Sequence, residues 1–494
     1  MDLQGLKEKI LQLAIQGKLV TQDPNDEPAS VLLERIRAER ERLIKEGKIK
    51  KQKQLPEITD EEKPFEIPEN WEWVRLGEVT IINPRNLFED EKQASFVPMA
   101  LIDEGFKNNH AFEVRLWKDI KKGFTHFAEN DVAVAKITPC FENRKSVIMR
   151  NLVNGIGAGT TELHIIRSIN ELVLPAYILI ICKTDRFIKD GISTYTGTAG
   201  QQRISKDFIM NYLIPLPPLA EQKRIVEKVN KLFALIDKLD SDKKELLEII
   251  NLTRNQVLQL AVQGKLIAQD PNDEPASVLL ERIRAERERL IKEGKIKKQK
   301  QLPEITDEEK PFEIPENWEW VRLGEVTIIN PRNLFEDEKQ ASFVPMALID
   351  EGFKNNHAFE VRLWKDIKKG FTHFAENDVA VAKITPCFEN RKSVIMRNLV
   401  NGIGAGTTEL HIIRSINELV LPAYILIICK TDRFIKDGIS TYTGTAGQQR
   451  ISKDFIMNYL IPLPPLAEQK RIVEKVDIIM NMLDEAESEL TAKV

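Results

Sequence analysis

The chain has 494 residues, of which 42% are hydrophobic and 30% charged, and its formal net charge is −4. This composition is typical of a folded, helix-rich protein with two or more domains, and it excludes both a disordered chain and a polycation that coats nucleic acid through overall charge. The four cysteines form no CxxC or Cys/His pattern, so we expect buried, reduced thiols rather than disulfides or a zinc site.

The N-terminus shows no signal-peptide core, and the most apolar run, residues 172–182, is too short to span a bilayer. We therefore expect a cytoplasmic protein without a membrane partner.

An internal duplication organises the chain, because residues 22–229 recur residue for residue as 269–476, each 247 positions later. Weaker similarity links residues 11–19 with residues 258–266. The expected segments are an N-terminal helix (1–22), a short helix with a charged linker (23–66), a mixed α/β domain (67–215), a long central helix (216–264), a second short helix with linker (265–313), a second mixed domain (314–462) and a C-terminal helix (463–494).

The first repeat opens with a predicted helix and a linker. Val31, Leu32, Ile36 and Leu43 recur at helical spacing after a turn at residues 23–28, and predict a helix that ends near Glu46. The lysine-rich run at 45–54 and the acidic run at 60–66 are typical of an exposed linker, with a basic contact to nucleic acid as the alternative.

Residues 67–215 alternate short aromatic and β-branched runs with Gly, Asn and Pro breaks, which is typical of a mixed α/β domain. Strands are predicted at 71–76, 79–82, 132–137, 146–149 and 163–166, and helices at 175–182 and 185–190. Residues 155–159 (GIGAG) are predicted to form a loop, because strand-like residues follow where a phosphate-binding helix would be needed. Residues 214–219 (IPLPPL) predict a rigid hinge.

Residues 219–263 predict one amphipathic helix, about 67 Å long at a rise of about 1.5 Å per residue. Its heptad seam has two interruptions, Lys243 and Thr253. The apolar seam positions are Ile225, Val229, Leu232, Ile236, Leu239, Leu246, Ile250, Val257 and Leu260.

A second rod is predicted from the two ends of the chain. Carried forward by 247 residues, the heptad register continues at Ile472, Val476, Ile479, Leu483, Ala486, Leu490 and Lys493, and then, across the gap between the termini, at Leu3, Leu6, Ile10 and Leu13. The predicted fold class is α+β: two mixed α/β domains separated by two long antiparallel coiled-coil helices, in a pseudo-two-fold circular organisation.

Motifs for catalysis are missing from the sequence. It lacks a Walker A motif, a helicase signature and the Asn-Pro-Pro-aromatic motif of amino-methyltransferases. The run Asp90-Glu91-Lys92 matches a metal nuclease only weakly, and His110, His126 and His164 have no ligand or nucleophile at a telling spacing. We expect no catalytic residue, no metal and no cofactor on this chain.

Recognition remains as the expected activity. Residues 131–212 hold ten Lys and Arg against seven Asp and Glu. Two stretches, 136–145 (KITPCFENRK) and 196–206 (TGTAGQQRISK), combine turn residues with side chains that read base edges or hold phosphates. The candidate DNA-binding residues of the two copies are Lys136, Thr138, Asn143, Arg144, Lys145, Gln201, Gln202, Arg203, Ser205, Lys206, Lys383, Thr385, Asn390, Arg391, Lys392, Gln448, Gln449, Arg450, Ser452 and Lys453.

Three stretches of each copy resemble the specificity subunit of Type I restriction–modification systems. They are residues 214–226 (IPLPPLAEQKRIV), residues 67–77 (IPENWEWVRLG), and residues 11–19 followed by DPNDEPAS. The resemblance covers the whole chain and occurs twice. It maps the family's recognition stretch onto residues 198–206 and its Thr-Pro-x-x-Glu-Asn turn onto residues 138–143.

The resemblance implies two target-recognition domains, each reading one half of a bipartite site in double-stranded DNA. It also implies helices that set the spacer and scaffold two modification (methyltransferase) subunits, with restriction subunits joining through that complex. S-adenosylmethionine, ATP and Mg would then belong to the partner subunits.

One feature departs from the family, whose members mostly carry two different recognition domains. Residues 67–215 and 314–462 are identical here, so we expect an interrupted palindrome that is methylated on adenine in each half. Two other classes stay open at this point: a coiled-coil adaptor that presents two copies of a protein-binding module without DNA, and a stand-alone nuclease.

Overall fold

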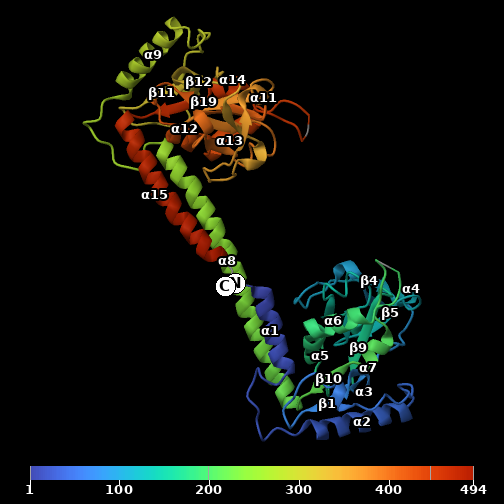
Figure 1. Cartoon of the computed structure of the whole chain (residues 1–494). Coiled ribbons are helices and arrows are strands. Elements are labelled where there is room, and N and C mark those ends of the chain that lie inside the picture. Colours follow the sequence, from blue (N-terminus) through green and yellow to red (C-terminus); the bar gives the residue numbers. More distant parts are fainter. Residues whose placement is uncertain (1, 199, 446, 493–494) are drawn as a thin grey trace. The chain divides into compact units, whose positions relative to one another are not determined.

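The computed structural model describes residues 2–198, 200–445 and 447–492. The chain divides into two compact units, one with the residues up to Asp242 and the other with residues Lys243–Ala492. The same elements occur in both units, 247 residues apart (Figure 1). The long helix α8 (Leu219–Val262) is shared, so that its first part belongs to the first unit and its second part to the second.

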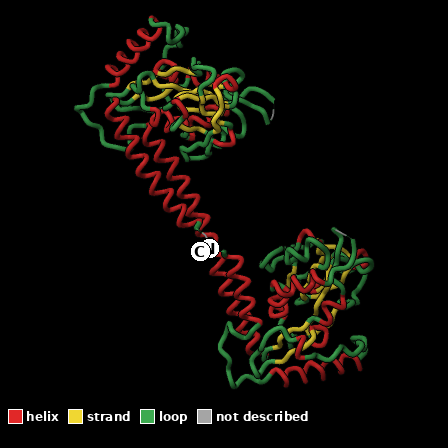
Figure 2. The backbone as a smooth tube through the Cα atoms, viewed as in Figure 1, coloured by secondary structure: helices red, strands yellow, loops and turns green. Residues whose placement is uncertain are grey.

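Within each unit a terminal helix pairs antiparallel with its part of α8 (Figure 2). In the first unit, α1 (Leu3–Ile15) pairs Lys7 with Asp237 at 2.5 Å, and Gln22, just beyond α1, donates to Glu221 at 2.6 Å. In the second unit, α15 (Leu466–Thr491) places Asp484 2.5 Å from Arg254, and Glu468 accepts from Gln269 at 2.7 Å. The predicted helix at 219–263 is therefore confirmed to within one residue.

The predicted seam is confirmed over most of its length. Its buried members are Ile225, Val229, Ile236, Ile250, Val257, Ile472, Val476 and Ile10, and its half-buried members are Leu232, Leu260, Ile479, Leu483, Ala486, Leu490, Leu3 and Leu13. Lys493, the last predicted position on the C-terminal helix, lies outside the described residues.

The seam prediction is wrong at Leu6, Leu239 and Leu246, whose exposed fractions are 40%, 45% and 46%. On α1 the buried stripe is broader and rotated, because this helix packs against both α8 and the domain helix α5. Along α8, the domain cores include residues only up to Ile236 and again from Val257 onward. Leu239 and Leu246 lie between these two positions, outside both domain cores.

Two four-stranded sheets and a two-stranded sheet build the domain of the first unit. The first sheet has the order β2 (Thr80–Ile82), β9 (Leu163–Ser168), β6 (Val132–Ala135), β7 (Ser146–Ile148), with antiparallel neighbours throughout. The second has the order β4 (Glu113–Leu116), β3 (Gln93–Val97), β8 (Ile156–Gly159), β5 (Thr125–Ala128), and its β3–β8 pair is parallel. Strands β1 (Glu72–Arg75) and β10 (Leu213–Leu216) form the third.

Helices complete this unit. They are α2 (Ala29–Lys45), α3 (Leu76–Val79), α4 (Trp117–Ile120), α5 (Pro175–Cys182), α6 (Asp185–Ser193) and α7 (Lys206–Asn211), with 3₁₀ turns at Asp60–Glu62, Met99–Leu101 and Val153–Gly155.

The second unit repeats these elements as α9 (Ala276–Lys292), β11 (Glu319–Arg322), α10 (Leu323–Val326), β12 (Thr327–Ile329), β13 (Gln340–Val344), β14 (Glu360–Leu363), α11 (Trp364–Ile367), β15 (Thr372–Ala375), β16 (Val379–Ala382), β17 (Ser393–Ile395), β18 (Ile403–Gly406), β19 (Leu410–Ser415), α12 (Pro422–Cys429), α13 (Asp432–Ser440), α14 (Lys453–Asn458) and β20 (Leu460–Leu463).

The loop prediction at residues 155–159 is wrong, because Ile156–Gly159 forms β8, a central strand. Glycine is needed there for space. A Cβ atom on Gly157 would lie 2.3 Å from the Ser95 carbonyl oxygen and 2.4 Å from the Phe127 ring. Glycine inside a strand commonly marks such a close approach.

The hinge prediction at 214–219 is wrong in its first half, since Leu213–Leu216 is β10. Pro215 lies opposite Trp73 in the two-stranded sheet, where a strand edge tolerates a residue without an N–H. The Tyr177 hydroxyl donates to the Pro215 carbonyl oxygen at 2.9 Å.

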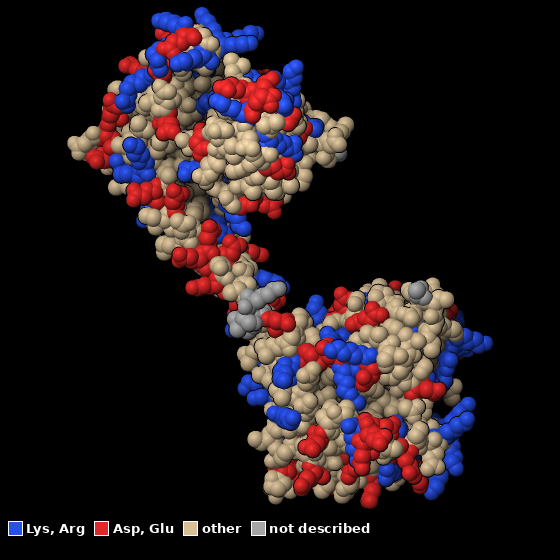
Figure 3. All heavy atoms as spheres, in the orientation of Figure 1, with Lys and Arg blue, Asp and Glu red and all other residues tan. Residues whose placement is uncertain are grey.

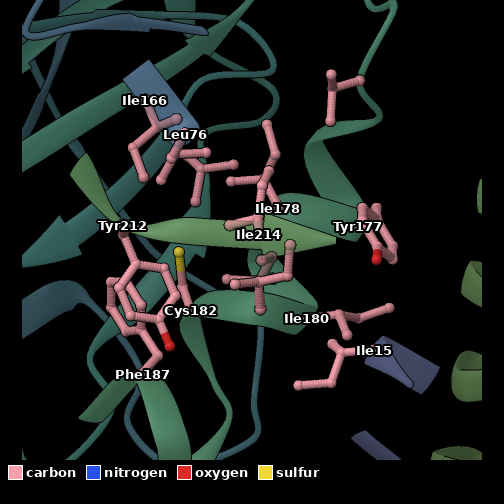
Figure 4. Packing of buried hydrophobic residues seen from close by; sticks show 14 of the residues in the cluster. Ile15, Leu76, Ile166, Tyr177, Ile178, Ile180, Cys182, Phe187, Tyr212 and Ile214 are labelled. Atoms are coloured by element: carbon pink, nitrogen blue, oxygen red, sulfur yellow. The ribbon is translucent and has the colours of Figure 1, made fainter. Parts of the chain in front are cut away.

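The core of each unit joins the domain to the long helices. Helix α5 is apolar on all sides, and Tyr177, Ile178 and Ile180 lie between the sheet and Ile15 of α1 (Figure 4). Cys182 is buried here, and burial raises the pKa of its thiol to about 12, as expected of an inert cysteine. Cys140 is only half-buried, unlike the prediction for all four thiols.

A buried polar contact fixes α8 to the domain. The Trp71 indole N–H donates to Glu221 Oε2 at 2.9 Å, and Gln222 Oε1 accepts from the Leu174 N–H at 2.9 Å. Burial raises the pKa of the Glu221 carboxyl, while the bonds from Trp71 and Gln22 oppose that rise.

Among the described residues, no helix is long and apolar enough to cross a membrane.

Candidate nucleic-acid interface

The two stretches that the sequence singled out lie side by side in the first unit. Residues 136–145 follow β6, and residues 196–206 connect α6 with α7. Ile137 forms a β-bridge with Arg203, the Thr138 N–H donates to the Gln202 carbonyl at 3.0 Å, and the Ile204 N–H donates to the Lys136 carbonyl at 2.9 Å. Main-chain bonds thus place Lys136, Thr138, Gln202 and Arg203 at one site.

A small hairpin forms the outer part of this site. Thr196 and Arg203 exchange two main-chain hydrogen bonds of 3.1 and 2.9 Å, and the Gln201 N–H donates to the Thr198 carbonyl at 3.0 Å. Gly197 has φ +113°, which favours glycine at this turn. Thr198, Gly200 and Gln201 are exposed, while Ala199 lies outside the described residues. The hairpin tip is therefore open to a ligand.

Arg203 ties the hairpin to the domain. Its Nε donates to Glu162 Oε2 at 2.8 Å, its Nη2 donates to Glu162 Oε1 at 3.1 Å, and its Nη1 donates to the Gln201 carbonyl at 2.7 Å. The bond from Arg203 holds the pKa of Glu162 below its usual range, so the pair stays ionised. The same three bonds recur between Arg450, Glu409 and Gln448. We therefore interpret Arg203 as a residue that positions Gln201 and Gln202.

A neutral, buried histidine of β9 contacts the main chain of the site. His164 is buried in β9, with Nε2 3.2 Å from the Ile204 carbonyl and Nδ1 3.2 Å from the Asn83 amide nitrogen. Burial is the main cause that lowers its pKa to about 4. An uncharged ring that donates from Nε2 and accepts at Nδ1 satisfies both contacts.

Arg144 and Lys145, which the sequence predicts as DNA-binding residues, form contacts within the unit. Arg144 contacts Asp185 of α6, lies 3.5 Å from Glu8 of α1 and stacks 4.7 Å from the Phe106 ring centroid. Lys145 Nζ donates to the Ile102 carbonyl at 3.1 Å. These bonds hold loops and helix α1 to the domain, so both side chains are occupied within the unit.

Of the remaining candidates, one caps a helix and two are exposed on the surface. Ser205 caps α7 by accepting from the Phe208 N–H at 3.1 Å. Lys206, the next residue, is exposed. Asn143 is exposed and its amide lies 3.4 Å from Glu104. All these residues have counterparts in the second unit: Lys383, Thr385, Asn390, Arg391, Lys392, Gln448, Gln449, Arg450, Ser452 and Lys453.

A polar cavity that sequence reasoning missed opens beside this site. In the second unit it has a volume of about 280 Å³ and is lined by Lys383, Arg332, His373 and Thr408, among others. Burial lowers the pKa of His373, so the cationic groups of the lining are Lys383 and Arg332. The Asn-Pro-Arg sequence directly after a predicted strand was the available signal for Arg332 and its counterpart Arg85.

The carboxylates of Asp90 and Glu91, which gave the weak nuclease match, form separate ion pairs. Asp90 lies 2.6 Å from Lys121, and Glu91 lies 3.0 Å from Lys118. Within the described ranges, no group of three or more His, Cys, Asp or Glu side chains could hold a metal ion. These carboxylates therefore belong to surface ion pairs.

Comparison with known proteins adds a family to this geometry. The family model described as Type I restriction modification DNA specificity domain matches residues 68–249 and 315–494, once in each unit. The Type I restriction enzyme EcoAI specificity subunit of Escherichia coli is 41% identical over 548 residues, covering 97% of this chain and 89% of the relative. The EcoEI specificity subunit of the same species is 48% identical over 371 residues, covering 66% of this chain and 62% of the relative.

Solved structures share the fold. The HsdS subunit from Thermoanaerobacter tengcongensis aligns with a TM-score of 0.55 at 19% identity, covering 87% of this chain and 94% of that one. A chain from a structure of complex assembly and conformational transition of the type I R-M system aligns with a TM-score of 0.57 at 20% identity, covering 86% and 94%. At these identities the likeness supports the architecture alone.

Proposed function

Because this chain belongs to the Type I restriction–modification DNA specificity family, we propose that each of its two domains reads one half of a single interrupted DNA site. The chain is a Type I specificity subunit with two DNA-specificity domains. One observation carries the finer proposal: residues 22–229 and 269–476 are identical, so both domains present the same hairpin and the same neighbouring cations. Identical readers in the inverted orientation that the circular heptad register predicts would bind an interrupted palindrome.

The hairpin supplies the side chains for reading bases. Gln201 is exposed at its tip and Gln202 is half-buried beside it, and a glutamine amide can bond adenine in the major groove through both its groups. Lys136 and Arg85 supply positive charge for phosphates near the hairpin. We assign Arg203 to positioning, since its guanidinium already bonds Glu162 and the hairpin main chain.

We propose that the helices measure the spacer and hold two methyltransferase subunits, through which restriction subunits join. Helix α8 spans 44 residues and is the segment that carries both domains. Its exposed apolar side chains include Leu235, Leu239, Ile249 and Leu252, at 45–67% exposure. Such a row on a long helix favours docking of another subunit. The adaptor alternative without DNA is disfavoured by the two family matches.

Catalysis belongs to the partners in this proposal. The two domains recognise DNA, and the chain contributes no catalytic residue. S-adenosylmethionine, ATP and Mg would bind to the methyltransferase and restriction subunits. A cytoplasmic assembly fits the inert, reduced Cys182 thiol.

Single-molecule methylation mapping of DNA from cells that express the chain with its methyltransferase subunit tests the proposal. The expected pattern is one interrupted palindrome with a modified adenine in each half. Two unlike half-sites would refute the palindrome while leaving the family assignment intact. Binding of purified complex to a duplex that carries the mapped site, with a steep dependence on salt, checks that recognition and modification belong to the same assembly.

A further inference from the structure

A lysine-rich strap follows helix α2 in the first unit and α9 in the second. We define the lysine strap as residues 48–58 and 295–305. From residue 50 to its end at residue 58 it contains neither helix nor strand. Ile49, Gln52, Leu55 and Ile58 are its half-buried members, at a spacing of three residues. Three residues per turn is the period of a polyproline II helix, so one edge of the strap faces the protein and the rest faces solvent.

A half-buried and a buried arginine anchor the strap at two points. Arg40 of α2 donates to Gln52 Oε1 at 3.0 Å and to the Thr80 carbonyl at 2.6 Å. Arg75 is 5% exposed and donates to the Pro56 carbonyl at 2.8 Å. The second unit repeats the arrangement, with Arg287 contacting Gln299 and Arg322 donating to the Pro303 carbonyl at 2.9 Å. The strap is thus a positioned surface rather than a loose linker.

The exposed positions of the strap up to Gln54 are all Lys or Gln, and the exposed residues that follow are Pro56 and Glu57. Lys48, Lys50, Lys51, Lys53 and Gln54 are exposed. Lys48 pairs with Glu46 at 2.8 Å, whereas Lys50, Lys51 and Lys53 form no ion pair with any described residue. In Figure 3, Lys and Arg side chains gather over the end of α9 at the top of the upper unit. The chain as a whole carries −4, so this is a local concentration of positive charge.

The strap is joined to the candidate DNA-reading site through α7. Arg75 bonds the Pro56 carbonyl of the strap and also donates to the Asn211 carbonyl at the end of α7, at 3.0 Å. The other end of α7 is Lys206, directly after the hairpin. Six helical residues span about 9 Å, which is about three base-pair steps of 3.4 Å.

We propose that the lysine strap binds the phosphate backbone of duplex DNA beside each half-site. This rests on the proposed function of the domains. At about 3.1 Å per residue, Lys48 to Lys53 covers about 15 Å, or about four phosphates of one strand. Lysine is a point charge that suits phosphates and carries no base specificity. Protein–protein interfaces are depleted of Lys and enriched in aromatic residues, whereas the exposed residues of the strap are lysines and Gln54 followed by Pro56 and Glu57, without an aromatic side chain, so DNA fits better than an acidic subunit.

The test replaces six strap lysines by Gln in the full complex with its methyltransferase subunits: Lys50, Lys51, Lys53, Lys297, Lys298 and Lys300. A matched variant removes the same charge from exposed lysines elsewhere: Lys18, Lys107, Lys189, Lys265, Lys354 and Lys436. Affinities for the mapped site and for a scrambled duplex are measured between about 50 and 200 mM salt. Native mass spectrometry records whether the methyltransferase subunits stay bound, and thermal melting checks the fold.

The strap variant should lower the slope of log affinity against log salt by about 0.9 for each lysine in contact, hence by up to about 5. Affinity should fall by the same factor on both duplexes, with their ratio unchanged to about twofold, and the matched variant should keep the wild-type slope. Trimming the DNA flanks should weaken the wild type but not the strap variant.

An unchanged slope, or an equal change in both variants, overturns the proposal. Loss of methyltransferase subunits from the strap variant also overturns it and assigns the strap to a protein partner. A wild-type complex that binds mapped and scrambled DNA equally would instead refute the proposed function, whatever the strap does.

Discussion

The ion pair between Arg203 and Glu162 makes a prediction that separates a base-reading residue from one that positions others. We consider Arg203→Ala together with Arg450→Ala, so that both units change. The substitution removes two bonds to Glu162 and one to the Gln201 carbonyl. Without them the hairpin must be ordered when DNA binds, at the expense of affinity.

The magnitude follows from the exposure of the pair. The side chains of Arg203 and Glu162 are 38% and 24% exposed, so solvent screening limits the expected loss to about fivefold in affinity for each of the two structural units. With both units changed, the loss is about 30-fold in affinity for the mapped site. Binding to a scrambled duplex should change by less than about threefold.

A second variant, Glu162→Gln with Glu409→Gln, distinguishes an arginine that positions the hairpin from one that contacts DNA. It removes negative charge, which by simple electrostatics should strengthen DNA binding, yet it should weaken cognate binding because the hairpin loses its tether. The combined variant should be no worse than the arginine variant alone. Arg35→Ala with Arg282→Ala, which breaks exposed ion pairs elsewhere, serves as the control and should have little effect. Our reasoning fails if Glu162→Gln leaves cognate affinity unchanged while Arg203→Ala abolishes it, because Arg203 would then contact DNA itself.

Three further predictions concern pH, packing and spacing. The pKa of His164 and of His411 is about 4 in the folded chain, whereas that of an unfolded histidine is about 6.5. The free energy of unfolding should therefore fall as the pH drops from about 6.5 to 4, by about 2–3 kcal/mol for each of the two structural units. Urea titrations should show that this pH dependence disappears when both histidines are replaced by Asn. Gly157→Ala should destabilise its unit by about 1–3 kcal/mol, since the new Cβ meets Ser95 and Phe127, and a normal melting temperature would contradict the packing. Removing one heptad from the middle of α8 and one from the end of α15 should change the spacer in methylation maps; altered half-sites would show that the helices do more than measure.

Local patterns in the sequence were sufficient for the long helices, for α2, α5 and α6, and for all four strands of the first sheet, but not for the short helices α3, α4 and α7. The heptad repeat predicted α8 to within one residue, and the apolar run at 175–182 predicted α5. Strands β1, β2, β6, β7 and β9 were predicted because aromatic and β-branched residues gather in short runs there. The second sheet was missed. Its strand β8 is Ile-Gly-Ala-Gly, which has little intrinsic preference for a strand and forms one because Phe127 and Ser95 close over its glycines.

In the candidate site, too, local patterns were predicted from the sequence and long-range pairing was not. Composition and turn residues identified stretches 136–145 and 196–206, but nothing local indicated that main-chain bonds join them. The partners of the cations also lie far away in the sequence: Arg203 pairs with Glu162, and Arg144 contacts Asp185 and Glu8. The sequence therefore could not distinguish the candidates whose side chains bond within the unit from those whose side chains are exposed.

The duplication and the long shared helix could be predicted without a structure, because the repeat and the heptad periodicity can both be read directly along the chain. Tertiary structure alone decided which cations are free. Arg144, Lys145 and Arg203 are occupied by distant carboxylates and carbonyls, while the strap lysines stay exposed because every third residue of their segment faces the protein instead. Charge availability depends on long-range pairing, and long-range pairing is fixed only when the chain folds.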